Sequence, residues 1–98
     1  MKGTQKQIEW AEKIKRDALW TLDSMVQNCQ RNDETLGSAD TVKYFGISTE
    51  KMIEFRDNMR AAWEKIDDAG LIIDSRANHT RSAYNKWVRL YYQGIFKF

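Results

Sequence analysis

An unbroken repeat of apolar residues at spacings of three and four runs through the first third of the chain. It comprises Ile8, Ala11, Ile14, Ala18, Leu22, Met25 and Cys29. This spacing places all of them on one face of an α-helix of about seven turns. Thr4 and Gln7 form a capping-box pattern that predicts the start of the helix. We expect it to end near Cys29–Asn32, because Asn and Asp continue a helix poorly.

Two further stripes predict two more long helices. The first follows Ser48, a candidate N-cap, and ends at Gly70; it contains Met52, Phe55, Met59, Ala62, Trp63 and Ile66. The second follows Asp74 or Ser75 as its cap and ends at Gly94; it contains Ala77, Tyr84, Trp87, Val88 and Tyr91.

Residues 30–38 are polar and predict a loop. A short helix is expected after it, with Ser38 or Asp40 as its cap, Val42 and Phe45 pointing inward, and Gly46 directly after its end.

The fold class predicted from these patterns is mostly α. Proline is absent and there are only five glycines, whereas a β-rich chain of this length usually needs both at many turns. Three stripes bury one another most simply in a small bundle of three to four helices, formed by residues 1–98 as a single domain. Residues 71–73 predict a short strand or a buried linker. If they pair with residues 95–98, a minor two-stranded ribbon results.

Catalysis and metal binding find little support in the residue types. His79 is the only histidine and is expected on an exposed first helical turn, and the only cysteine, Cys29, lies on the apolar stripe as a buried thiol. A lone cysteine excludes an internal disulfide and a cysteine-based zinc site. We therefore expect no enzyme, no cofactor and no metal site.

No apolar run is long enough to span a membrane and no secretory signal is expected, which favours a cytoplasmic protein.

Charge is unevenly distributed along the chain. Residues 1–74 contain 11 Lys or Arg and 14 Asp or Glu, whereas residues 75–98 contain five Lys or Arg and no acid. The basic end either neutralises the acidic remainder within the fold or forms a contact surface for an anion or acidic partner. In the second case Arg81, Lys86 and Arg89 would contact nucleic acid, with Tyr92 as the spare aromatic residue.

Trp20 departs from the apolar pattern of its predicted helix. It falls nearly opposite the stripe, on a polar face that also contains Lys13, Arg16 and Asp17. It is either covered by another part of the chain, such as residues 40–47, or exposed. An exposed Trp is a common anchor of protein-binding surfaces, so these four residues are the candidate partner-binding site.

Two motifs resemble a family of small uncharacterised bacterial and phage-borne proteins. Residues 3–14 read GTQKQIEWAEKI and are similar to that family's Gly-Thr-x-Lys-Gln-x-x-Trp-Ala-x-x-Ile opening. Residues 69–76 read AGLIIDSR and resemble its later Ala-x-x-x-Ile-Asp-x-Arg motif, with Leu-Ile where aromatics are frequent and Ser where Asn is frequent. The resemblance implies a phage or mobile-element context and no known chemistry.

Both motifs also have a structural interpretation, as a junction between helix starts. Thr4 and Gln7 would cap the first helix, Trp10 would pack at its margin, and Asp74 would cap the last helix. Arg76 would pair with one of the acids Glu9, Glu12 and Asp68.

These observations together favour a phage or mobile-element protein that acts by binding. An inhibitor of a host defence system, of the anti-CRISPR kind, is the leading expectation, with a host nuclease or CRISPR effector as partner. A net charge of +2 argues against a DNA mimic, which would need strong acidity. The alternative is a nucleic-acid-binding accessory protein that uses the basic C-terminal helix. The sequence does not define an oligomeric state.

Overall fold

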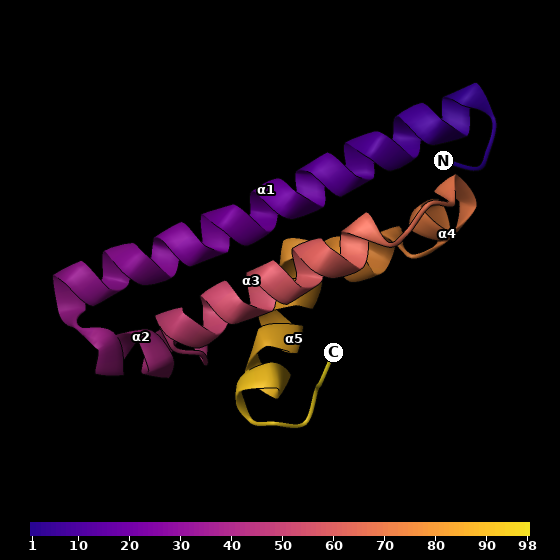
Figure 1. Cartoon of the computed structure of the whole chain (residues 1–98). Helices are drawn as coiled ribbons and strands as arrows, with labels where there is room; N and C mark the ends of the chain where they lie inside the picture. Colours follow the sequence, from indigo (N-terminus) through magenta and orange to yellow (C-terminus); the bar gives the residue numbers. More distant parts are fainter.

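One helix, α1 (Gln5–Leu36), extends along the whole molecule in the computed structural model, which describes residues 1–98. Its 32 residues at 1.5 Å each account for the longest dimension of the protein, 47 Å. The other elements are α2 (Ser38–Phe45), α3 (Thr49–Glu64), α4 (Ala69–Asp74), the 3₁₀-helix η1 (Arg76–His79) and α5 (Arg81–Tyr92). In Figure 1, α2 turns the chain at one end of α1, α3 returns alongside it, and α5 runs across the bundle. The prediction of a mostly α bundle is confirmed.

The predicted start of α1 is confirmed in atomic detail. The Gln7 backbone N–H donates to Thr4 Oγ1 at 3.2 Å, and the Thr4 N–H donates to Gln7 Oε1 at 3.0 Å.

The prediction that the helix ends by Asn32 is wrong, because α1 continues to Leu36 and stops at Gly37. Asn32 donates to Asp40 and Thr41 of α2, and Thr41 donates to Asp33. Side chains that bond to another helix no longer compete with their own backbone, so the helix survives them.

The next two helix boundaries follow from local chemistry. Gly46 adopts a left-handed conformation with φ 75° directly after α2, as predicted, and Ser48 accepts from the Lys51 N–H to cap α3. The predicted caps Ser38 and Asp40 are wrong, because Gly37 precedes α2 and no side chain caps it.

The predicted two-stranded ribbon is absent. Residues 71–73 belong to α4, where Ile72 and Ile73 are buried, and α3 ends at Glu64 rather than at Gly70. The cause is Asp68, whose carboxylate accepts from the Gly70 and Leu71 N–H groups at 2.9 and 3.3 Å and so begins a new helix.

The C-terminal residues fold back onto an aromatic cluster instead of pairing as a strand. The rings of Phe96 and Phe98 lie 6.2 and 5.3 Å from the ring of Phe55, and Phe96 lies 4.9 Å from Trp87. Aromatic packing, which leaves Phe96 half-buried and Phe98 52% exposed, therefore takes the place of the strand that the alternating pattern of the tail predicted.

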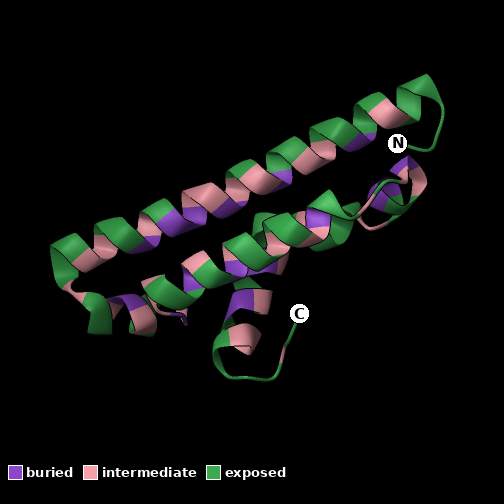
Figure 2. Ribbon diagram, viewed as in Figure 1, coloured by how far each residue is buried: buried purple, intermediate pink, exposed green.

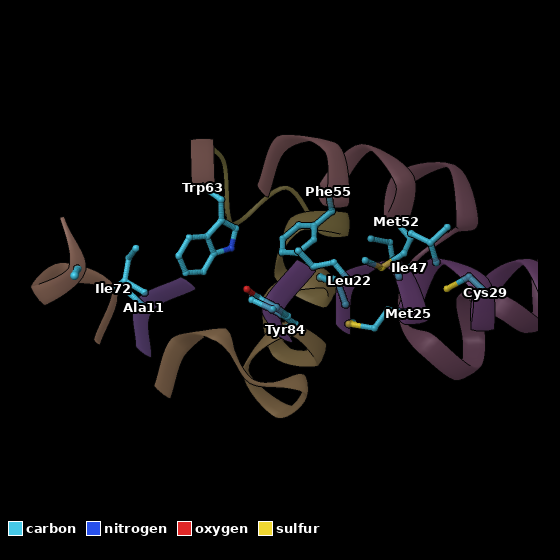
Figure 3. Close-up of a cluster of buried hydrophobic side chains, with 14 residues drawn as sticks. Ala11, Leu22, Met25, Cys29, Ile47, Met52, Phe55, Trp63, Ile72 and Tyr84 are labelled. Carbon is cyan, nitrogen blue, oxygen red and sulfur yellow. The ribbon is translucent and has the colours of Figure 1, made fainter. Parts of the chain in front are cut away.

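The core lies along the inner face of α1. Figure 2 shows buried positions facing the space between α1 and α3, with exposed positions along the outer side of α1. Trp63, Phe55 and Tyr84 are its largest fully buried side chains. Figure 3 shows Phe55 and Tyr84 beside Leu22 of α1, with Trp63 farther along the core toward Ala11 and Ile72. Trp63, Phe55 and Tyr84 come from α3 and α5, so these two helices supply the largest side chains that pack against the inner face of α1.

His79 is half-buried against this core, so the expectation of an exposed surface histidine is wrong. Its ring stacks 4.4 Å from the Trp63 ring, and its Nδ1 lies 2.8 Å from the Tyr84 hydroxyl. The short helix η1 places His79 next to Trp63, and Thr80 then caps α5. The predicted start of the last helix at Asp74 or Ser75 is therefore too early, and His79 does not lie on its first turn.

Trp63→Ala should lower the free energy of unfolding by about 3–5 kcal/mol, because it empties a fully buried site. Trp87→Ala, at a half-buried site, should cost less. Urea unfolding of both variants checks this ranking. A Trp63→Ala protein within about 0.5 kcal/mol of the parent would contradict the assignment of Trp63 to the core.

Stability should fall as pH drops below about 6.5, the ordinary pKa of histidine. Burial lowers the pKa of His79 in the folded state, so the unfolded chain binds a proton first and acid favours unfolding. The urea concentration at the unfolding midpoint should decline between roughly pH 7.5 and pH 5, a range that brackets the ordinary histidine pKa of about 6.5. It should decline in the parent and decline less in His79→Gln. Equal declines in the two proteins would assign the pH dependence to other groups.

Candidate interaction surfaces

Trp20 is exposed, and the alternative in which residues 40–47 cover it does not hold. Its side chain is 69% accessible. The segment that contains α2 packs instead against the last turns of α1, where Asn32 and Asp33 contact Asp40 and Thr41. The neighbouring Lys13, Arg16 and Asp17 are exposed as well. We call these four residues the Trp20 surface.

A shallow hollow adjoins Trp20 on the α3 side. It is lined by Glu12, Lys15, Arg16, Leu19, Trp20 and Asp23. Arg60 and Arg56 of α3 hold Asp23 at 3.0 and 3.6 Å, which fixes the edge of the hollow. One aromatic ring, the apolar Leu19 side chain and charges of both signs thus meet here, a mixture typical of protein–protein contact surfaces rather than of anion sites.

The basic residues of α5 are exposed but differ in their surroundings. Arg81 donates to Ser24 Oγ of α1 at 2.9 Å. The stem of Arg89 covers Gly46, where an added Cβ would lie only 2.5 Å from Arg89 Cγ. Lys86 makes no such contact, and Tyr92 is 42% exposed on the last turn. None of the three basic side chains forms an ion pair with a carboxylate. The alternative in which these residues neutralise acids of the same fold therefore has no direct ion pair to support it.

The predicted junction exists, but different contacts hold it. The Arg76 guanidinium lies 5.3 Å from the centre of the Trp10 ring and donates to the Ile73 carbonyl at 2.7 Å. No ion pair joins Arg76 to any of the predicted acids, Glu9, Glu12 and Asp68. Asp74 does not cap α5; it is the last residue of α4, and the Thr80 hydroxyl accepts from the Ala83 N–H instead.

The N-terminus contributes to this junction, a contact that was not among the predictions from the sequence. The Met1 ammonium lies 3.1 Å from Asp67. The Lys2 N–H donates to the Asp67 carbonyl, and the Lys2 carbonyl accepts from the Ala69 N–H. Asp68 caps α4 at the same place. An Asp just before Ala-Gly and an apolar run was the available signal, because Asp is a favoured N-cap.

Cys29 is a buried thiol, as its position on the apolar stripe predicted. Burial, aided by the nearby charge of Asp33, raises its pKa to about 11. The thiolate that nucleophilic catalysis requires is therefore scarce at neutral pH. Among the 98 residues, no group of three or more His, Cys, Asp and Glu side chains is arranged to hold a metal ion. No helix combines the length and apolar character needed to cross a membrane.

No protein-family model matches this sequence, and comparison with curated proteins and with solved structures finds no significant match. The phage-borne resemblance and the functions it implies therefore stay predictions.

Trp10 and Arg76 should be energetically coupled. A double-mutant cycle of Trp10→Ala and Arg76→Gln, measured by urea unfolding, should give a coupling energy of about 0.5–1 kcal/mol, typical of an exposed cation–π pair. Matched cycles of Arg76 with Glu9 and with Glu12 should give values near zero. Coupling to either acid and none to Trp10 would restore the salt-bridge interpretation.

Proposed function

We propose that this chain is a phage or mobile-element protein that binds and inhibits a host defence protein. The partner would be a nuclease or CRISPR effector in the cytoplasm, and the contact would be the Trp20 surface. The observation that carries the proposal is the 69% exposure of a Trp on the side of α1 that the fold does not use.

An exposed Trp of this kind suits a protein partner. Trp anchors at the centre of an interface commonly cost about 2 kcal/mol or more when truncated. Leu19 adds apolar area on one side, while Lys13, Arg16 and Asp17 supply a polar rim. The net charge of +2 does not suit mimicry of DNA, so the proposed inhibition works by occupying a protein surface.

The phage and anti-CRISPR context has a different basis from the surface. It rests on the resemblance of residues 3–14 and 69–76 to phage-borne proteins and on the general class of small non-catalytic inhibitors. Neither argument uses the fold.

A second candidate function, a nucleic-acid-binding accessory protein, is favoured by one specific observation. Arg81, Lys86 and Arg89 project from α5 with no carboxylate paired to them. Unpaired cations on one helix are available to phosphate groups.

The leading proposal is tested with purified CRISPR effector nucleases loaded with guide RNA. The parent chain should bind one of them and inhibit its cleavage of target DNA. Trp20→Ala should stay folded by circular dichroism and lose binding by at least about 30-fold, the loss expected for an anchor worth about 2 kcal/mol.

Tyr44→Ala is the matched control, because Tyr44 on α2 is an aromatic residue that is 72% exposed outside the Trp20 surface. It should inhibit as well as the parent. Full inhibition by Trp20→Ala would remove the surface assignment. Failure of the parent to bind any effector would remove the anti-CRISPR proposal itself.

A further inference from the structure

Three adjoining hollows, a small and mostly enclosed one and two that open to solvent, are linked by shared lining residues, and none of the three is lined by an acidic residue. The first, of about 30 Å³, lies between α1, α5 and the segment that follows α2, and Asn28, Arg81 and Asn85 are its polar residues. The second shares Asn28 and is lined by Asn28, Arg31, Asn32, Thr35 and Phe45. The third shares Asn85 and is lined by Ser82, Asn85, Lys86, Arg89, Leu90 and Gln93. We call their polar residues the acid-free band.

The two other prominent hollows differ in charge. The hollow beside Trp20 contains Glu12 and Asp23, and the one between α1, α2 and α3 contains Asp33 and Glu50. The acid-free band ends at Asn32, whose amide donates to Asp40. Among these hollows, only the linings of the three in the band lack carboxylates, while Asp33 and Asp40 lie just beyond them, near Cys29 and Asn32.

We propose that the acid-free band binds the phosphate backbone of a nucleic-acid duplex. The proposal deepens the second candidate function, and it is independent of the Trp20 surface. It adds Arg31 of α1, and the amides of Asn28 and Asn85, to the basic residues of α5.

The side chains of the band match the chemistry of phosphate oxygens. Arg31, Arg81, Lys86 and Arg89 are permanent cations at neutral pH, and the Asn, Gln, Ser and Thr residues between them donate neutral hydrogen bonds. Most protein–DNA hydrogen bonds to the backbone come from these residue types. Arg81 uses one Nη2 contact to reach Ser24, which orients the guanidinium and leaves its other N–H groups free for a phosphate.

The shortage of exposed aromatic rings favours a duplex over a single strand. Proteins that bind single strands stack successive bases on aromatic side chains. The only ring lining the band is the half-buried Phe45. Two exposed rings lie beside it singly: Tyr44, which packs edge-on against Phe45 with 4.9 Å between ring centres, and Tyr92, next to Gln93, so the band has no row of successive rings. Without a stacking platform, recognition falls on the backbone and should be independent of sequence.

The experiment is fluorescence anisotropy with a labelled duplex of about 20 base pairs, titrated with the full chain between roughly 50 and 200 mM salt. Four phosphate contacts predict a slope of log K against log salt of about −3.6. Two unrelated duplex sequences should bind equally, and one strand alone more weakly. Arg31→Gln with Lys86→Gln should reduce the slope by about 1.8, because neither residue has a side-chain hydrogen bond or ion pair in the fold.

Lys13→Gln with Arg16→Gln is the matched control, since it also removes two positive charges but lies outside the band. It should leave the slope of the parent unchanged. Equal effects of the two double variants, a parent slope near zero, or preference for the single strand would each overturn the proposal. Binding to polyglutamate as tight as to the duplex would also overturn it and would identify the band as a site for an acidic protein. Trp20→Ala should bind the duplex like the parent, so loss of duplex binding and loss of effector inhibition are separable.

Discussion

Burial of one face of α1 is the constraint on which the rest of the structure depends. The short helices α2, α4 and α5 are too short to be stable alone, because isolated helices below about 12–15 residues are marginal in water. Each gains stability by packing on the apolar stripe of α1 or on the residues that cover it. Phe55 of α3 and Tyr84 of α5 pack beside Leu22. Trp63 packs farther along, toward Ala11 and Ile72, and the half-buried His79 stacks against it.

A scaffold that uses only one face of its longest helix leaves the opposite face available. The helical spacing that buries Leu22 directs Trp20 outward, so the exposed Trp is a direct consequence of the stripe. The crossing of α5 over the bundle has a second consequence, because it brings Asn85 and Arg81 beside Asn28 of α1. The molecule thus presents two surfaces of different chemistry, one with an apolar anchor among mixed charges and one basic without acids.

The parts of the fold that were predictable depend on neighbours along the chain. The Thr4 capping box, the Ser48 cap and the turn at Gly46 each need only a few consecutive residues. The failures depend on distant partners. Residues 30–36 are helical because Asn32 and Asp33 bond to α2, and the aromatic residues of the tail pack on Phe55 and Trp87, far away in the sequence or outside the tail, rather than pairing as a strand.

The candidate sites follow the same division. Periodicity predicted that Trp20 lies off the apolar stripe, but whether residues 40–47 cover it was left open, because that depends on where α2 packs. The partner of Arg76 could not be predicted, because Trp10 and three nearby acids all suit a guanidinium and only the placement of η1 selects the ring. Asn28 was missed because nothing in the sequence indicates that α5 crosses beside it, and Arg31 because nothing there indicates that it lines a hollow adjoining that crossing.

The central claim is that α1 folds the protein through one face and leaves the other for binding. Paired urea unfolding of Leu22→Ala and Trp20→Ala tests it most directly. Leu22→Ala, at a fully buried site, should lower the free energy of unfolding by about 2–5 kcal/mol. Trp20→Ala removes a larger side chain but should lower it by less than about 0.5 kcal/mol, because Trp20 is exposed. Comparable losses at the two positions would show that both faces of α1 support the fold, and would contradict the account.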